Sequence, residues 1–224
     1  MGKAAESPLN YTQCKLNPEV RDAVKIIAEP QNARSRRTAA ALLRAARELI
    51  EQEGFAALTM AAVAERAHVS RRAVYLHYAT RTELLAALYH SLGETDDLAG
   101  SLQAVWDCPD AVSALTEWAE HIARSHPRIL GVLRVVERAQ HGDPDAAELW
   151  RTAQGNWLKG CRRLMRWLAD DGQLAPIWTV NTATDMMWAL MSIDILDRLL
   201  NHRRWSRKRV AQHLANLFQV TFAR

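Results

Sequence analysis

Apolar residues recur every three to four positions along most of the chain after residue 36, which is the spacing of one face of an α-helix. This pattern predicts helices over residues 37–52, 59–67, 70–78, 80–92, 110–124, 127–136, 143–170, 179–200 and 206–222. No stretch alternates apolar and polar residues for long enough to predict a strand, and the sequence has no internal repeat. We therefore predict an all-α fold.

Residues that cap or break helices mark the predicted boundaries. Gly54 and Gly172 are expected to stop helices, and Asp143 is placed to cap a long one. Thr80–Glu83 fits a capping box, in which the glutamate accepts a hydrogen bond from the cap residue's N–H. Pro127 is expected at the first position of a helix, because an interior proline removes a backbone hydrogen bond.

The first 33 residues carry three prolines, mixed charge and no sustained period. We expect residues 1–33 to be a flexible N-terminal extension. The basic run Arg34–Arg37 follows, and two interpretations stay open: an arm that contacts DNA, or a solvated linker. Residues 34–92 then form a predicted DNA-binding domain. The acidic segment Gly93–Asp97 separates it from a second domain over residues 93–224.

Two short helices joined by a tight turn are predicted between Thr59 and Arg81. Thr59 can cap the first helix and Ser70 the second, because a hydroxyl oxygen accepts from the free N–H groups at a helix start. The second helix then exposes Arg71 and Arg72 in its first turn. This arrangement is typical of a helix-turn-helix, whose second helix enters the major groove of DNA. The alternative is a surface hairpin with a solvated basic face.

The segment from about Arg36 to Leu92 resembles the N-terminal domain of TetR-family transcriptional regulators. The resemblance rests on Gly54-Phe55, the capping Thr59, the turn Ala67-His68-Val69-Ser70, the helix end Tyr75-Leu76-His77-Tyr78, and Arg81 followed by Leu84-Leu85. Two positions depart from the family pattern, with His68 where glycine is usual and Arg81 where lysine is usual. Histidine tolerates positive φ better than most residues, and arginine can hold a phosphate.

The resemblance implies a role for each residue of this surface. Arg71 and Arg72 donate to guanine or to phosphates, and the sequence does not decide which of them reads a base. Tyr75, His77 and Arg81 match family positions that contact the DNA backbone. The predicted DNA-binding residues are Arg36, Arg37, Thr59, Ser70, Arg71, Arg72, Ala73, Tyr75, His77 and Arg81.

The charge distribution favours the same segment. The net charge of +4 equals the excess over residues 34–90, which hold nine arginines and five acids, as neutralisation of phosphates requires. Three scattered cysteines fit a reducing compartment and offer no disulfide framework. No apolar run approaches the ~20 residues of a membrane span. We expect a cytoplasmic, nucleoid-associated protein without a membrane partner.

All eight tryptophans lie beyond residue 100. Most are expected to fill a helical core, but the resemblance implies a ligand pocket between the middle helices. The candidates for its lining are Trp106, Trp118, Leu133, Trp150, Trp157, Met187 and Met191. Aromatic walls suit a flat apolar ligand or, through cation–π attraction, a lipophilic cation that meets Glu117, Glu120 or Glu137.

The segment Thr179–Leu200 is apolar on nearly every side, so it must be covered on every side. The resemblance implies that residues 179–200 and 207–222 pair across a two-fold axis to form a homodimer. The alternative is burial within one subunit.

Together these features indicate a dimeric transcriptional regulator, a repressor released from a palindromic DNA operator by a small apolar or aromatic effector. The resemblance implies a shift between two states, with helix Thr82–Leu92 carrying the movement between domains. A ligand-independent, architectural DNA-binding protein on the same fold is the alternative. No metal-ligand cluster, phosphate loop or nucleophile motif is present, so we expect no cofactor, no metal and no catalytic residue.

Overall fold

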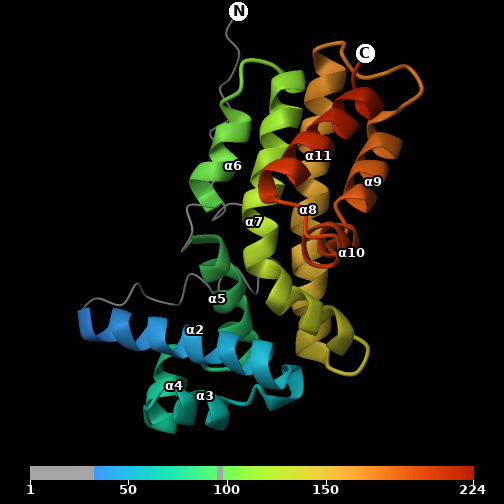
Figure 1. Cartoon of the computed structure of the whole chain (residues 1–224). Coiled ribbons are helices and arrows are strands. Elements are labelled where there is room, and N and C mark those ends of the chain that lie inside the picture. The colour runs from blue at the N-terminus through green and yellow to red at the C-terminus, as the bar shows by residue number, and fades with distance from the viewer. Residues whose placement is uncertain (1–32, 95–97) are drawn as a thin grey trace, which may run out of the picture.

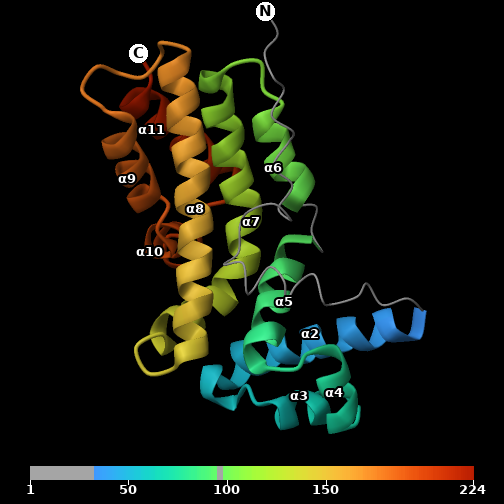
Figure 2. The ribbon, with the colours of Figure 1, turned by 180° about the vertical axis from the view of Figure 1, so that it is seen from behind.

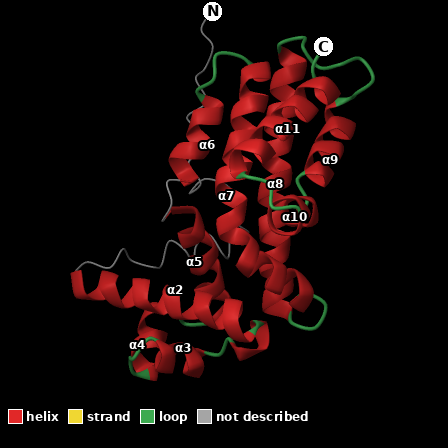
Figure 3. Cartoon of the chain, viewed as in Figure 1, coloured by secondary structure: helices red, strands yellow, loops and turns green. Residues whose placement is uncertain are grey.

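The computed structural model describes residues 33–94 and 98–224, and every regular element in these ranges is a helix (Figure 3). Within them, extended pairing is confined to one isolated antiparallel bridge between Leu174 and Ala223. The prediction of an all-α fold is confirmed. The predicted extension lies outside the described residues except for Ala33. None of the described helices is both long and apolar enough to cross a membrane.

Five elements form the lower part of the molecule (Figure 1). They are α2 (Ala33–Glu53), the 3-10 turn η2 (Phe55–Ala57), α3 (Met60–Arg66), α4 (Arg71–His77) and α5 (Arg81–Glu94). The apolar stripe predicted for the first helix faces inward, with Leu42, Ala46 and Ile50 buried. The helix ends where Gly54 adopts a φ of 90°, which glycine reaches without a steric penalty.

The upper part is a bundle. It consists of α6 (Leu98–Trp106), α7 (Ala111–Ala139), α8 (Pro144–Asp170), α9 (Val180–Leu190), α10 (Ile193–Asp197), the π-helical turn η3 (Arg198–His202) and α11 (Arg207–Phe222). The two long helices α7 and α8 run side by side through it, and their lower ends reach α2 and α5 (Figures 1 and 2). The N-cap predicted for the long helix α8 is confirmed, because Asp143 accepts from the N–H groups of Asp145 and Ala146.

Helix α7 continues through Pro127, so the predicted helix start at this residue is wrong. An interior proline costs roughly 3 kcal/mol, because one backbone hydrogen bond is lost. Buried side chains lie on both sides of it, Ile122 before and Ile129 after, and both pack against neighbouring helices. This packing offsets the missing bond, so the helix continues past the proline.

The single helix predicted over residues 179–200 is also wrong. The chain leaves the helix after α9, and Ser192 caps α10 by accepting a hydrogen bond from the Ile195 N–H at 3.4 Å. Serine side chains compete with the helical hydrogen bonds of the backbone, which is why they favour caps over helix interiors. The apolar period continues across this break because α9 and α10 bury residues of the same core, including Met187 and Leu196.

Buried side chains form two clusters. One joins α2–α5 to the lower halves of α7 and α8 and contains Leu88, Leu133 and Leu149. The other fills the upper bundle and contains Leu115 and Phe218. The helix-turn-helix part therefore shares a core with α7 and α8. The domain boundary at residue 93 stays a prediction.

Candidate DNA-binding and ligand-binding sites

Two hydroxyl caps shape the predicted helix-turn-helix. The Thr59 hydroxyl oxygen accepts from the Ala62 N–H at 3.1 Å and starts α3. The Ser70 hydroxyl oxygen accepts from the Ala73 N–H at 3.2 Å and starts α4. Between the two helices, His68 adopts a φ of 54°, as expected for the position where glycine is usual.

Helix α4 is amphipathic over only two turns. Val74 and Tyr78 are buried against the supporting helices, whereas Arg71, Arg72 and Tyr75 are exposed. Neither arginine forms an ion pair with any residue that the structure describes. Their guanidinium groups are therefore available to an anionic partner.

The other predicted contacts surround this helix. His77 is half-buried, and burial lowers its pKa, so the neutral ring keeps one N–H donor near pH 7. The first turn of α4 also holds Ala73, which is partly covered. Thr59 and Ser70 use their oxygens as helix caps, and each hydroxyl proton stays available as a donor.

The basic run before the predicted first helix is not an extended arm. Helix α2 begins at Ala33, so Arg34–Arg37 lies within its first turns, and the Arg37 Nε–H donates to the Ala33 carbonyl at 3.3 Å. The helix thus begins earlier than predicted, and the two interpretations of the run, contact with DNA or exposure to solvent, both stay open. Arg36 and Arg37 stay predicted DNA contacts, now placed on a rigid helix.

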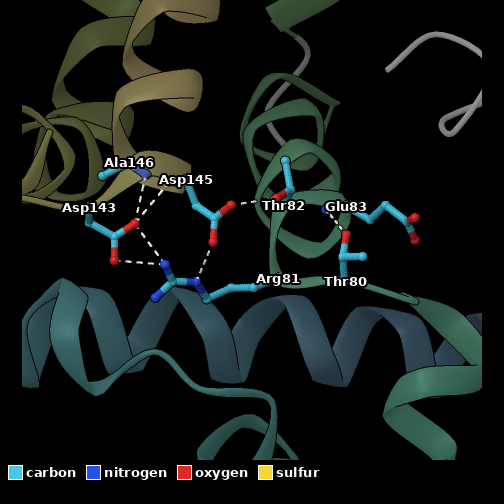
Figure 4. A network of polar contacts seen from close by, with 7 residues as sticks. All are labelled: Thr80, Arg81, Thr82, Glu83, Asp143, Asp145 and Ala146. Carbon is cyan, nitrogen blue, oxygen red and sulfur yellow. Dashed lines mark hydrogen bonds and ion pairs between the residues drawn. The ribbon is translucent and has the colours of Figure 1, made fainter. Parts of the chain in front are cut away.

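Arg81 is paired within the protein, and its predicted contact to DNA stays a prediction. Its guanidinium lies between two aspartates at the start of α8, with Nε 2.7 Å from Asp145 Oδ2 and Nη2 2.7 Å from Asp143 Oδ1 (Figure 4). The same group lies 5.3 Å from the ring centroid of Phe55. A guanidinium held by two carboxylates has few donors left for a phosphate.

A second contact strengthens this junction, which we call the α5–α8 latch (Arg81, Thr82, Asp143 and Asp145). The Thr82 hydroxyl donates to Asp145 Oδ1 at 2.5 Å (Figure 4). Burial opposes ionisation of Asp143, but the hydrogen bonds from Arg81 and from backbone N–H groups outweigh it, and the pKa of Asp143 is lowered. The Asp143 carboxylate is therefore ionised at neutral pH.

The capping box at the start of α5 forms with a shift of one residue. Thr80 accepts from the Glu83 N–H at 3.1 Å, as predicted. The Glu83 carboxylate accepts from the N–H of Ala79 at 2.8 Å, rather than from that of Thr80. The carboxylate thus accepts a hydrogen bond from the backbone N–H of Ala79, the residue before the cap.

The predicted ligand pocket is largely packed core. Of its seven candidates, Trp118, Leu133, Trp157, Met187 and Met191 are buried, and Trp106 is half-buried. Their side chains contact one another and small residues. The Trp118 indole N–H lies 3.2 Å from Met191 Sδ, and its ring lies so close to Gly160 that a Cβ there would clash.

A pocket of about 190 Å³ lies lower, between α7, α8, α9 and the start of α10. Among the seven candidates, Trp150 lines it. The lining residues are Glu137, Trp150, Gln154, Trp188, Ala189, Ser192, Ile193 and Asp194. Trp188 and Asp194 could not be predicted as lining residues, because they meet only where the predicted single helix breaks.

The carboxylates considered as partners of a cation separate into two groups. Glu117 and Glu120 lie 2.5 Å and 3.7 Å from the guanidinium of Arg124, so both are already paired. Glu137 lines the pocket. Of the three, it is the glutamate that a bound cation would meet.

An exposed second helix with two unpaired arginines, set across a tight turn from a supporting helix, defines a helix-turn-helix protein. Residues 42–88 match the sequence model of the family described as "Bacterial regulatory proteins, tetR family". This segment, which holds the predicted helix-turn-helix, is therefore similar to the DNA-binding part of TetR-family regulators. No curated protein sequence matches the chain.

Solved structures extend the similarity to the whole fold. NalD, the secondary repressor of the MexAB-OprM multidrug efflux pump in Pseudomonas aeruginosa, superposes with a TM-score of 0.66 at 20% identity, over 86% of this chain and 99% of NalD. SmeT in complex with triclosan gives 0.66 at 18% identity, over 84% and 92% of the two chains. A transcriptional regulator from Saccharomonospora viridis in complex with choline gives 0.64 at 17% identity, over 83% and 97%. At these identities the similarity establishes the fold.

Proposed function

We propose that the protein is a homodimeric repressor that acts in the cytoplasm and leaves a palindromic operator when a small effector binds its upper bundle. The observation that carries this proposal is the exposed first turn of α4, where Arg71 and Arg72 are unpaired among the described residues. Arginine is the residue that most often reads guanine in the major groove.

Exposed apolar side chains support the dimer. Met186 and Trp188 on α9, and Leu217 and Val220 on α11, are each more than a third exposed. Large apolar side chains gathered on two helices are typical of an interface. Two copies joined there would present two copies of α4 to a two-fold symmetric operator.

The α5–α8 latch supports the regulatory part of the proposal. Helix α5 packs on α2 below and on α8 above, so a shift of α8 is transmitted to the DNA-binding part. An effector shifts the balance between two arrangements only by its difference in affinity for them, typically 1–3 kcal/mol. NalD as a repressor and SmeT with a bound small molecule are consistent with this mechanism.

A ligand-independent DNA-binding protein is the second candidate. The observation in its favour is the packing of the central tryptophans, because Trp118 lies directly against Gly160 in the region predicted for a cavity. On this alternative, DNA binding would not respond to small molecules.

Selection of genomic fragments by the purified protein, followed by footprinting at two salt concentrations, tests the proposal. We expect a protected palindrome whose affinity falls steeply with salt, because phosphate contacts release counterions. Weak binding spread over all fragments would favour the second candidate.

A further inference from the structure

The pocket between α7, α8, α9 and α10 has two kinds of wall. Trp150 and Trp188 contribute indole rings, and Glu137 and Asp194 contribute carboxylates. None of the described residues that line it is a lysine, arginine or histidine. The site is therefore aromatic and negatively charged.

Neighbouring groups compensate these charges only in part, since Arg134 and Arg138 favour the ionised form of Glu137 without pairing with it. Neither the Glu137 nor the Asp194 carboxylate forms a hydrogen bond or ion pair with a described residue. Arg134, one turn before Glu137, is held by the buried Asp197 at 2.7 Å. Burial, and then repulsion from Asp194, raises the pKa of Glu137. A positive charge between the two carboxylates would attract both of them and offset their mutual repulsion.

One indole that lines the pocket is held in place by a hydrogen bond. The Trp188 Nε1–H donates to Gln154 Oε1 at 2.9 Å, which links α9 to α8. Trp188 is 37% exposed in a single copy, so its ring is also accessible from outside the pocket before two copies meet. A ring fixed in this way presents a constant face to a ligand.

The size of the pocket limits the ligand. About 190 Å³ is less than the roughly 300–1,000 Å³ of sites for drug-sized molecules. An uncharged apolar ligand of this size would desolvate two carboxylates without pairing them, which is unfavourable. A small cation gains from the carboxylates and from the faces of the aromatic rings.

We propose that this pocket binds a small organic cation, an ammonium compound of few non-hydrogen atoms, with Trp150 and Trp188 against its alkyl groups and Glu137 and Asp194 balancing its charge. Such a cation would be the effector. Binding of the cation does not depend on the proposed function, but release of DNA by the bound cation does. That consequence has a direct route, because Trp150 lies on α8 only about 8 Å along the helix axis from Asp145 of the latch.

Calorimetric titration of the full-length protein tests the binding itself. The probes are choline and 3,3-dimethylbutan-1-ol, in which a carbon replaces the charged nitrogen. We expect choline to bind at least 10-fold more tightly, because only the cation interacts with the carboxylates and the ring faces. Equal binding of the two compounds, or binding of neither, overturns the proposal.

Substitutions locate the site. Glu137→Gln and Asp194→Asn should each weaken choline binding about 5- to 10-fold, and Trp188→Leu should do the same. Glu120→Gln is the matched control, since it lies on the same helix and is paired with Arg124. Thermal melting establishes that each variant is folded. Unchanged affinity in both acid variants, or an equal loss in Glu120→Gln, contradicts the assignment.

Repeating the titration with operator DNA separates the two proposals. Choline binding that depends on Glu137 but leaves DNA bound supports the pocket and contradicts the proposed regulation. Release of DNA by an uncharged compound, with no choline binding, supports regulation and overturns the cation site.

Discussion

At the scale of single residues, Arg71 and Arg72 differ from most arginines of the chain in having exposed guanidinium groups at a helix start. The N-terminal end of a helix also carries a partial positive charge, so both the side chains and the helix end attract phosphates. The seven-residue helix α4 concentrates these features on a single turn.

Replacing Arg71 by alanine should weaken operator binding by about 1–3 kcal/mol. Footprinting of the variant on operators with single base changes measures this loss of affinity. Relaxed specificity at one position means that Arg71 reads a base, whereas a uniform loss assigns it to the backbone. Arg203→Ala, an exposed arginine of the upper bundle, is the control. Unchanged affinity of the Arg71 variant would remove it from the interface.

Two buried histidines of α7 make the free energy of unfolding depend on pH. Burial, with a smaller effect of Arg124, lowers the pKa of His121 to about 4, and burial with His121 lowers that of His126 to about 3. His126 Nε2 has no hydrogen-bond partner among the described residues. Its ring packs on Trp157, with centroids 5.1 Å apart.

The free energy of unfolding should fall as pH decreases from about 6.5 toward 4. Both folded pKa values lie below the unfolded value of 6.5, so protons bind the unfolded chain first and favour it. Denaturant unfolding across this range should show a shallower slope for His126→Leu. His141→Leu, at an exposed position, should keep the original slope. Equal slopes in all three proteins would contradict the assignment.

Local features of the site could be predicted from the sequence, and distant pairings could not. The caps Thr59 and Ser70 and the positive φ of His68 follow from neighbouring residues. The partners of Arg81 lie 62 and 64 positions further along the chain, and no local pattern connects them. The packing of Trp118 on Gly160 depends equally on how two helices meet.

At the scale of elements, the α5–α8 latch joins the start of one helix to the start of another. Acidic residues are favourable at the N-terminus of α8, where they complement the helix dipole, and here they also bind Arg81. Asp143 thus serves both as the cap of α8 and, together with Asp145, as the contact between the two parts of the molecule.

Arg81→Ala should lower the free energy of unfolding by about 1–2 kcal/mol, between the values for exposed and buried ion pairs. The side chain is only 24% exposed, so the loss exceeds that of a surface pair. Arg47→Ala, which breaks a more exposed pair with Glu51 within α2, is the comparison. Denaturant titration of both variants measures the difference. A loss as small as that of Arg47→Ala would contradict a structural role for the latch.

The sequence predicted most helices because an amphipathic period is a local signal. It failed where packing overrides local preference, as in the passage of α7 through Pro127. It also failed where the apolar period continues across a break, as at Ser192. Both errors concern helix continuity and left the fold class unaffected.

At the scale of the whole molecule, α9 and α11 leave apolar side chains on the surface of a single copy. Their exposure is costly in water and is relieved if the same faces of two copies meet. The proposed dimer would also fix the separation of the two α4 helices.

Leu217→Glu should convert the dimer to a monomer and lower operator affinity, because a charge on each copy would be buried at the interface. Light scattering after gel filtration gives the mass, and footprinting gives the affinity. Ile177→Glu is the control, since Ile177 is exposed just before the predicted interface helices. Dissociation by the control alone would place the interface elsewhere.

The distribution of tryptophans has an optical consequence. The DNA-binding helices hold none of them, and all eight lie beyond residue 100. Tryptophan emission therefore comes entirely from the part of the chain beyond residue 100. Operator DNA placed against α4 has no indole beside it to quench. A change in tryptophan emission when DNA binds at α4 would therefore report a change transmitted through the protein, so the native chain carries its own reporter of communication between its two parts.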